Sequence, residues 1–268
     1  MNQSDIKVSI YGSCNRPHLW EWFYSSVEMN SLNFEIVFVG NVKPTFTLPD
    51  NFKFIYSNVK PAQCNYIGAM NCSGEVIQHI ADDCHLAPYG LDMLYSLYKD
   101  QSNYKYIVAP KLIGIVNAIP DDDDGIAYIQ KYADTQPVDS PDMHIIHGDM
   151  NSIPAHIGGF MSRQFYNELG GIDKNFIMQR WDLDLQIRAH QAGAKTIFSD
   201  KVWIAERKDL CPNWQSGVTG RYHCDHELYM RMWFSNSSTI PQRSAEFQPY
   251  EMNDTILTRS QGPKGEWD

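Results

Sequence analysis

The chain has 268 residues, of which 43% are hydrophobic, and it carries a formal net charge of −10. This length allows one large domain or at most two, with enough apolar residues to bury a full core. The acidic charge argues against wrapping a long nucleic-acid duplex, because such binding needs Lys and Arg to neutralise phosphates. The sequence has no signal-peptide pattern and no apolar run of membrane-spanning length, and its six cysteines contain no CxxC pair. We therefore expect a cytoplasmic protein with reduced thiols.

The first part of the chain alternates expected strands and helices. Strands are predicted at 6–13, 33–41, 52–57, 75–83 and 104–114, and helices within 14–30 (Asn15 as N-cap, Pro17 in the first turn), 60–74 (ending at Gly74) and 90–101. This alternation predicts an α/β fold with a Rossmann-like, doubly wound and mostly parallel sheet. In such sheets ligands bind beyond the carboxyl ends of the strands, which here are Gly12 to Asn15, Gly40 to Asn41 and Asp82 to Asp83.

Regular patterns stop at about 116 and return at about 157. The intervening stretch is rich in Pro, Asp and Ser and is typical of a binding loop, in which the acidic run 121–124 is expected to be solvated. Further helices are predicted at 162–169, closed by Gly170 and Gly171, at 182–193 and within 223–233, with one or two strands over 195–206. The last thirty or so residues are expected to wrap the domain or to be disordered.

Several segments, taken in order, resemble the family 2 glycosyltransferases of the GT-A fold. The loop "CNRP" follows the first strand as in that family, and "QCNYIGAMNCSGEVIQHIADD" has the layout that leads to the family's DXD motif. The segments "GGFMSRQFYNELGGIDKNF" and "WDLDLQIRAHQAG" are similar to the family's acceptor half.

The resemblance covers about residues 6–200. It implies a GT-A domain over 1–208, with a nucleotide-binding half at about 1–115 and an acceptor half, or acceptor-side subregion, at about 150–208. Residues 209–268 are expected to form a C-terminal extension that packs on the same domain and is partly flexible. The implied activity is inverting transfer of a sugar from a nucleotide-sugar donor, in the first place a UDP-sugar, to a hydroxyl of a glycan or other acceptor.

The resemblance also implies a metal site at the end of the strand over 75–83. In the family's DXD motif the last Asp binds the metal and the first approaches the ribose, whereas here the three positions are Ala81, Asp82 and Asp83. We assign Asp83 to Mn²⁺ or Mg²⁺, and Asp82 to the ribose or the metal. A divalent cation on carboxylates neutralises the charge that builds on a departing diphosphate. The alternative is that both carboxylates only cap a helix that begins near Pro88.

Inverting transfer needs a general base that takes the proton of the acceptor hydroxyl. In the family this base is usually the Asp of an "ED" pair at the start of the acceptor-side helix, and here the pair reads Trp181-Asp182. Asp182 is thus the candidate base, and Trp181 is a candidate for stacking on a sugar ring. Asp182 as a mere N-cap carboxylate is the alternative, and Asp184 is expected to pair with Arg188 on the same helix.

The remaining candidate residues also follow from the resemblance. Gly158 and Gly159 are expected where the backbone approaches the donor sugar and the acceptor, since glycine has no side chain to block close contact. His223 or His226 is the expected third metal ligand; a zinc site with Cys211 and Cys224, or a plain surface histidine, is the alternative. The residues assigned to the nucleotide, besides Asp82, are Ser13, Asn15, Arg16, Asn41 and Asn65.

Three other functions stay open from the sequence. A nucleotidyltransferase would share the sheet, but the loop "GSCNRP" is not the Gly-rich, Lys-bearing loop expected to cradle a triphosphate. Ala81, Asn41 and Trp181 stand where the family usually has acids, which is consistent with a degenerate domain that binds a carbohydrate or nucleotide sugar without turnover. A glycosyltransferase that acts on modified DNA bases is the third.

Overall fold

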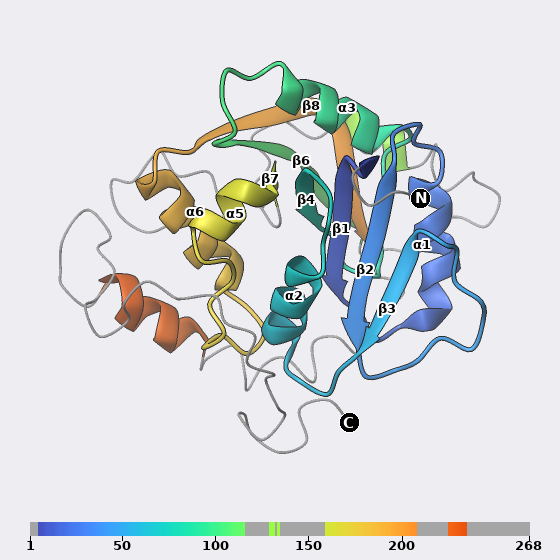
Figure 1. Cartoon of the computed structure of the whole chain (residues 1–268), viewed down its shortest axis with the longest axis horizontal. Helices are drawn as coiled ribbons and strands as arrows, with labels where there is room; N and C mark the ends of the chain where they lie inside the picture. Colours follow the sequence, from blue (N-terminus) through green and yellow to red (C-terminus); the bar gives the residue numbers. More distant parts are fainter. Residues whose placement is uncertain (1–4, 116–128, 132, 135–158, 208–224, 235–268) are drawn as a thin grey trace.

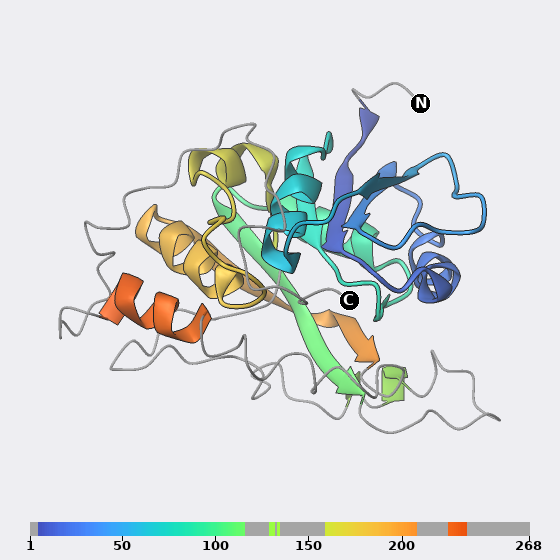
Figure 2. The same cartoon turned by 90° about the horizontal axis from the view of Figure 1, so that it is seen from below.

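The computed structural model describes residues 5–115, 129–131, 133–134, 159–207 and 225–234. These residues form an eight-stranded sheet with helices on both of its faces (Figures 1 and 2). The strands are β1 (Val8–Ser13), β2 (Phe34–Gly40), β3 (Phe52–Tyr56), β4 (Val76–His79), β5 (Cys84–Leu86), β6 (Tyr106–Ile115), β7 (Phe160–Ser162) and β8 (Lys195–Arg207). The helices are η2 (Pro17–Leu19), α1 (Trp20–Val27), α2 (Pro61–Met70), α3 (Gly90–Lys99), α5 (Arg163–Glu168) and α6 (Trp181–Gln191), and residues 225–234 are also helical.

The sheet runs in the order β3-β2-β1-β4-β7-β6-β8-β5. Strands β3, β2, β1 and β4 are parallel neighbours, and β6 is parallel to β8. Strand β7 is antiparallel to both β4 and β6, and β5 is antiparallel to β8. The predicted α/β class with a mostly parallel sheet is confirmed, and the alternating strands and helices of the first half account for it.

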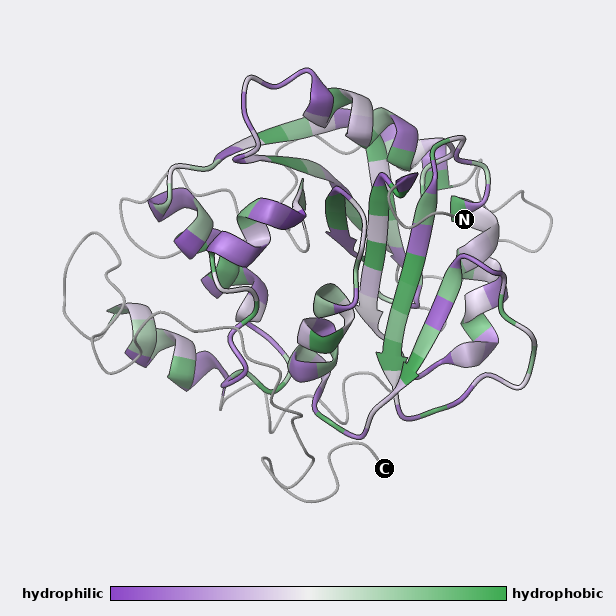
Figure 3. Cartoon of the chain, in the orientation of Figure 1, coloured by the Kyte–Doolittle hydropathy of each residue, from purple (hydrophilic) through white to green (hydrophobic). Residues whose placement is uncertain are grey.

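Both faces of the sheet are buried: β1 and β2 are buried at nearly every position, and β2 is mostly apolar (Figure 3). Successive side chains of a strand point to opposite faces. Accordingly Ile10 packs with α1 and α3 in one core cluster, whereas its neighbour Tyr11 packs with α2, α5 and α6 in the other. Tyr229, Met232 and Trp233 of the 225–234 helix belong to this second cluster. The described part of the C-terminal region therefore contributes to the core.

The predicted strand over 75–83 is wrong at its end. Strand β4 stops at His79, the chain turns at Asp82 and Asp83, and Cys84–Leu86 forms the separate strand β5. The Ile80 N–H still donates to the Tyr11 carbonyl at 3.0 Å, so the ladder to β1 ends only there. The carboxylates of Asp82 and Asp83 bond to Arg16. Arg16 precedes them in the chain by 66 and 67 residues.

Other element ends differ from prediction by a few residues. The helical segment begins at Pro17 as expected, but Asn15 is not its cap, because the Asn15 side chain accepts a hydrogen bond from the Asn41 N–H at 3.1 Å. Helix α2 ends at Met70 and not at Gly74. The region 195–206 belongs to a single strand, β8, whose pairing with β6 shifts register at Pro110, a residue that has no N–H to donate.

The predicted helix ends in the second half are confirmed. Ser162 caps α5 by accepting a hydrogen bond from the Phe165 N–H at 3.0 Å. Gly170 and Gly171 follow that helix with φ values of 79° and 72°, in the left-handed region that favours glycine. The run 121–124 lies outside the described residues.

No helix within the described ranges is both long enough and apolar enough to cross a membrane.

Cys14, Cys64, Cys72 and Cys84 are buried free thiols, and the other two cysteines lie outside the described residues.

Candidate active site

The carboxyl ends of β1 and β2 lie side by side and are joined through their loops. The Asn41 N–H donates to the Asn15 side chain at 3.1 Å, and the Cys14 N–H donates to the Val39 carbonyl at 2.8 Å. Gly40 permits this approach, because a Cβ atom there would lie 1.9 Å from the Cys14 carbonyl oxygen. This edge of the sheet brings together Ser13, Asn15, Arg16 and Asn41, which were assigned to the nucleotide.

Asp82 is fully buried at this edge, and both of its carboxylate oxygens are hydrogen-bonded. Oδ2 accepts from the Arg16 backbone N–H at 2.8 Å and from the Trp20 indole N–H at 3.3 Å. Oδ1 accepts from Arg16 Nε at 2.8 Å and also from Arg16 Nη2. Asp82 therefore fixes the loop after β1 and orients the Arg16 guanidinium.

Asp83 meets the same guanidinium from its other side. Arg16 Nη1 donates to Asp83 Oδ2 at 2.8 Å, and the Asp83 side chain is 9% exposed against 0% for Asp82. Burial raises the pKa of the Asp83 carboxyl; the Arg16 cation opposes the rise, and the neighbouring Asp82 charge adds to it. Arg16 is thus the cation that lets two adjacent carboxylates stay together in a buried place.

The donor set at this edge fits a hard divalent cation. Carboxylate oxygens are the ligands that Mg²⁺ and Mn²⁺ prefer, and these ions complete their shell with phosphate oxygens and water. Asp83 is the better placed ligand of the two, because its buried side chain still keeps 9% exposure, whereas Asp82 is fully buried with both oxygens engaged by Arg16 and Trp20. Within the described residues no cluster of three or more His, Cys, Asp or Glu side chains that could hold a metal is found.

Of the two candidates for the third metal ligand, the structure describes only His226. His226 lies in the 225–234 helix and does not join Asp82 and Asp83 in a three-ligand cluster among the described residues. His223 and Gly158 lie outside the described residues, and Gly159 is buried directly before β7. Neither carboxylate caps α3, since that helix begins at Gly90 after Tyr89 and has no side-chain cap.

Asn65 and Ser13 flank the edge on the α2 side. The Ser13 side chain hydrogen-bonds the Cys64 thiol in the first half of α2. Asn65, the next residue, is 4% exposed, and its Oδ1 has no hydrogen-bond partner among the described residues. A buried amide oxygen without a partner is costly, which makes Asn65 a reasonable ligand-binding candidate.

Trp181 and Asp182 start α6 next to the carboxyl end of β4. The Trp181 ring packs edge-on against His79, the last residue of β4, with ring centroids 4.9 Å apart, and Trp181 is only 5% exposed. Its buried position makes it a packing residue in this structure, and sugar stacking by Trp181 stays a prediction. Asp182 is the second residue of α6 rather than its N-cap, which is Arg180.

Asp182 is half-buried, and its charge acts on two tyrosines. Burial raises the pKa of Tyr11 in β1 and of Tyr229 in the 225–234 helix, and the Asp182 charge adds to both rises. The predicted Asp184–Arg188 pair is confirmed, with Arg188 Nη2 2.6 Å from Asp184 Oδ2. Asp184 is therefore structural, and Asp182 is the half-buried carboxylate of the first turn of α6.

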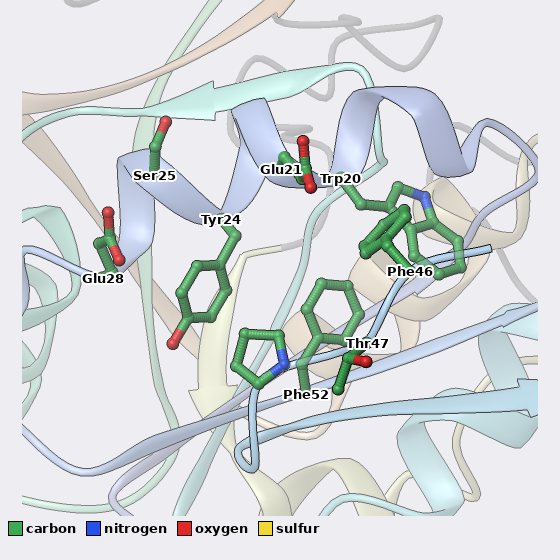
Figure 4. A pocket seen from close by; sticks show the side chains of 9 residues that line it. Trp20, Glu21, Tyr24, Ser25, Glu28, Phe46, Thr47 and Phe52 are labelled. Carbon is green, nitrogen blue, oxygen red and sulfur yellow. The ribbon is translucent and has the colours of Figure 1, made fainter. Parts of the chain in front are cut away.

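A pocket of about 180 Å³ lies behind Trp20, on the face of the sheet that α1 covers (Figure 4). It is lined by Trp20, Glu21, Tyr24, Ser25, Glu28, Phe46, Thr47, Pro49 and Phe52. Ligand pockets for whole cofactors usually exceed about 300 Å³. This pocket is too small for a nucleotide sugar, but it shares Trp20 with the Asp82 hydrogen bonds.

Sequence reasoning missed three contributors to this site. Two of them are the Trp20 indole and the side-chain contacts of Arg16. Both bond to Asp82, more than sixty residues later in the chain, and local sequence patterns do not reveal such distant contacts. Tyr229, whose pKa the Asp182 charge helps to raise, lies in a helix and comes 47 residues after Asp182 in the chain. An Arg directly before a predicted helix at a strand end was the one available signal for a counter-ion to Asp82 and Asp83.

The sequence matches no protein-family profile and no curated protein. Among solved structures the chain is similar to S. aureus TarS 1–349 in complex with UDP, with a TM-score of 0.52 and 10% identity over 75% of this chain and 60% of that one. It is also similar to GalNAc-T7 with UDP, GalNAc and Mn²⁺, with a TM-score of 0.57 and 14% identity over 86% of this chain and 48% of that one. The chain thus spans about half to three fifths of the length of these structures.

At such identities the similarity concerns the fold. The chain's eight-stranded, mostly parallel mixed sheet matches the fold of these structures. The described chain therefore has the fold of GT-A glycosyltransferase structures.

Proposed function

We propose that this chain is an inverting, metal-dependent glycosyltransferase related to family 2, which transfers a sugar from a UDP-sugar to an acceptor hydroxyl. The observation that carries the proposal is the Asp82–Arg16–Asp83 cluster at the ligand-binding edge of a GT-A fold, with Asp182 beside the end of β4. TarS and GalNAc-T7 with bound UDP, the latter also with Mn²⁺, support a nucleotide-sugar donor and a divalent metal.

In this proposal the residues of the edge hold the donor. Asp83 is the ligand for a divalent cation, which when bound neutralises the charge on the departing diphosphate. Arg16 supplies a second positive charge at the same place, and Asp82 keeps it oriented. Asn15 and Asn41 offer amide groups for the ribose and base at the ends of β1 and β2, and Asn65 in α2 offers a buried amide oxygen without a hydrogen-bond partner among the described residues.

Asp182 acts on the acceptor. The acceptor oxygen attacks the anomeric carbon on the face opposite the phosphate, and the bond from that carbon to the phosphate oxygen breaks with its electron pair going to UDP. The proton of the acceptor hydroxyl passes to the Asp182 carboxylate. Burial of Tyr11 and Trp181 around the first turn of α6 keeps water from that carboxylate on the sheet side.

The test is release of UDP from a panel of UDP-sugars in the presence of Mn²⁺, after thermal-shift screening has found the donor that raises the unfolding midpoint. We expect Asp182→Asn to lower kcat by roughly 10²-fold or more, and Asp83→Asn to remove the response to metal. Asp50→Asn, at an exposed carboxylate far along the β2–β3 connection, is the matched control. A chain that neither binds a nucleoside diphosphate nor consumes any nucleotide sugar would overturn the proposal.

The second candidate is a nucleotide-sugar-binding domain without turnover. The observation in its favour is that Arg16 engages both carboxylates of the expected metal site. Such a domain would bind UDP but release none from a UDP-sugar above the background rate, whereas an enzyme would release it in proportion to its own concentration.

A further inference from the structure

The loop over 173–180 leads directly into α6. The first turn of α2 holds this loop through two hydrogen bonds. The Ala62 N–H in the first turn of α2 donates to the Ile177 carbonyl at 3.0 Å. The next side chain, Gln63, donates to the Lys174 carbonyl at 3.1 Å. These bonds tie the start of α2 to the segment that sets where α6 begins.

Asp225 holds the same loop from the opposite side. Its Oδ1 accepts from the Ile177 N–H at 2.9 Å, and its Oδ2 accepts from Met178 N–H at 2.7 Å and Gln179 N–H at 2.8 Å. The Asp225 residue is 1% exposed. Hydrogen bonds from backbone N–H groups to a carboxylate are stronger than neutral ones, and three that converge on one group fix the path of the backbone.

Arg180 comes next and has an unfavourable backbone conformation. Its φ of 64° and ψ of −10° place this N-cap residue of α6 in the left-handed region. A residue other than glycine keeps such a conformation only where the surrounding contacts impose it. Gln179, bonded to Asp225, lies on one side of Arg180, and Trp181 and Asp182 open α6 on the other.

The other end of the 225–234 helix contacts α6 itself. The Trp233 indole N–H donates to Asp184 Oδ1 at 3.1 Å, and Asp184 pairs with Arg188 on the same helix. The 225–234 helix is therefore attached both to the loop before α6 and to the first turn of α6, and Asp182 lies between the two attachments.

We infer that Asp225 is a positioning residue for the transfer reaction: through the backbone of Ile177 to Gln179 it holds the first turn of α6 so that the Asp182 carboxylate faces the acceptor. This inference deepens the proposed function and rests on the role given there to Asp182. Asp225 itself touches neither substrate nor metal.

The test compares Asp225→Asn with Glu227→Gln in the full chain. Both variants remove one negative charge from the same helix, but Glu227 is exposed. In Asp225→Asn one acceptor oxygen becomes an NH₂ donor that faces backbone N–H groups, so we expect faster hydrogen exchange at residues 177–179. We also expect kcat for sugar transfer to fall roughly tenfold to a hundredfold with little change in the KM for the donor, because a small misplacement of a catalytic group costs about this much. Glu227→Gln should change neither quantity.

Two further variants separate positioning from general damage. Asp225→Glu keeps the charge and is expected to recover part of the lost kcat, and it serves as the second probe if Asp225→Asn does not fold. In the Asp182→Asn background the Asp225→Asn change should cost almost nothing more, because the group that it positions is already gone.

Unchanged exchange at 177–179 in Asp225→Asn would overturn the inference, as would an equal loss of kcat with and without the Asp182 carboxylate. Failure of the proposed function is seen separately: if the wild-type chain consumes no nucleotide sugar, the enzyme assignment fails, and positioning for transfer falls with it. If the wild type is active but Asp182→Asn retains full kcat, the base assignment and this inference both fail while the transferase assignment stands.

Discussion

The residue on which the candidate site depends most is Arg16. Two adjacent carboxylates in a buried place repel each other and lose hydration, and each effect disfavours ionisation. Arg16 offsets both with hydrogen bonds to Asp82 and Asp83 while it remains 30% exposed on the side where a diphosphate would arrive. The cluster is therefore a cation held at a strand end by two acids, ready for an anionic ligand.

Replacing Arg16 by Gln is expected to lower the free energy of unfolding by about 3 kcal/mol, because it leaves two buried carboxylates without their cation. Mn²⁺ should restore part of this loss, since a divalent ion on Asp83 neutralises the same charges. Urea unfolding with and without Mn²⁺ measures both effects, with Lys43→Gln, an exposed cation at the same edge, as the control. A variant as stable as wild type, or one that Mn²⁺ stabilises no more than wild type, would contradict this account of Arg16.

Besides Asp83, His79 is a residue near the site whose pKa is shifted by burial. It lies where β4 contacts Trp181 of α6. Burial lowers the pKa of His79 from 6.5 to about 4. The unfolded chain therefore binds a proton at a pH where the folded chain does not. The contribution of neutral His79 to the free energy of unfolding is fully present above pH 6.5. It is lost as the pH falls toward 4, which lowers the free energy of unfolding by up to about 3 kcal/mol.

His79→Phe, which keeps a ring against Trp181, removes this titration. As the pH is lowered from 7.5 to 4.5, the wild type should lose more unfolding free energy than the variant. Urea unfolding at each pH measures this difference. Parallel pH curves for the two proteins would show that folding does not lower the pKa of His79, and would contradict this prediction.

At the scale of elements, the site depends on loops that interlock beyond the strand ends. The loop after β1 passes directly over the end of β2, where Gly40 leaves room for the Cys14 carbonyl and the Asn15 side chain. Asn15 then accepts the Asn41 N–H, and Arg16, one residue further, reaches Asp82. The position of Arg16 is thus a consequence of how close β1 and β2 come at their ends.

Gly40→Ala tests this dependence. The added Cβ would lie 1.9 Å from the Cys14 carbonyl oxygen and 2.5 Å from Asn15 Oδ1, so the loop must move. We expect a loss of about 1–3 kcal/mol of stability together with weaker UDP binding, because Arg16 moves with the loop. Val42→Ala, at an exposed side chain two residues on, should leave both unchanged. If Gly40→Ala binds UDP as wild type does, the loop is not what positions Arg16.

The elements also show what the sequence could and could not predict. The existence of β1, β2 and β3 and the turn at Gly170 and Gly171 followed from local patterns, and the parallel arrangement of β1 to β4 followed from the alternation of strands and helices. The short strands β5 and β7 escaped prediction, because each has only three residues and exists through pairing with β8, β4 or β6. Their apolar runs, "CHL" and "FMS", are too short to show any period.

The site residues divide in the same way. Asp82, Asp83 and Asp182 were proposed from the order of segments that resemble the family 2 glycosyltransferases, because that order can be followed along the sequence alone. Asp225 was not singled out, since its partners are three backbone N–H groups nearly fifty residues earlier, and backbone groups leave no trace in the sequence. Contacts of this kind are fixed only when the 225–234 helix packs into the core.

At the scale of the whole molecule, the proposed function requires a chain with a net charge of −10 to bind an anionic donor. The overall field opposes the approach of a nucleoside diphosphate, so affinity has to come from local positive charge. Among the described residues Arg16 and the exposed Lys43 lie at this edge, and Arg16 is already engaged with Asp82 and Asp83. A divalent cation at Asp83 would both add positive charge and release Arg16 for the diphosphate, which makes strong metal dependence the expected behaviour.

The central claim, a UDP-sugar site built on Asp83, is tested most directly by calorimetric titration of the full chain with UDP, in Mn²⁺ and in EDTA. We predict binding in Mn²⁺ that weakens at least about tenfold, or 1.4 kcal/mol, in EDTA, and a similar loss in Asp83→Ala but not in Asp50→Asn. The account is contradicted if neither UDP nor any other nucleoside diphosphate binds in Mn²⁺, or if Asp83→Ala binds UDP as tightly as the wild type.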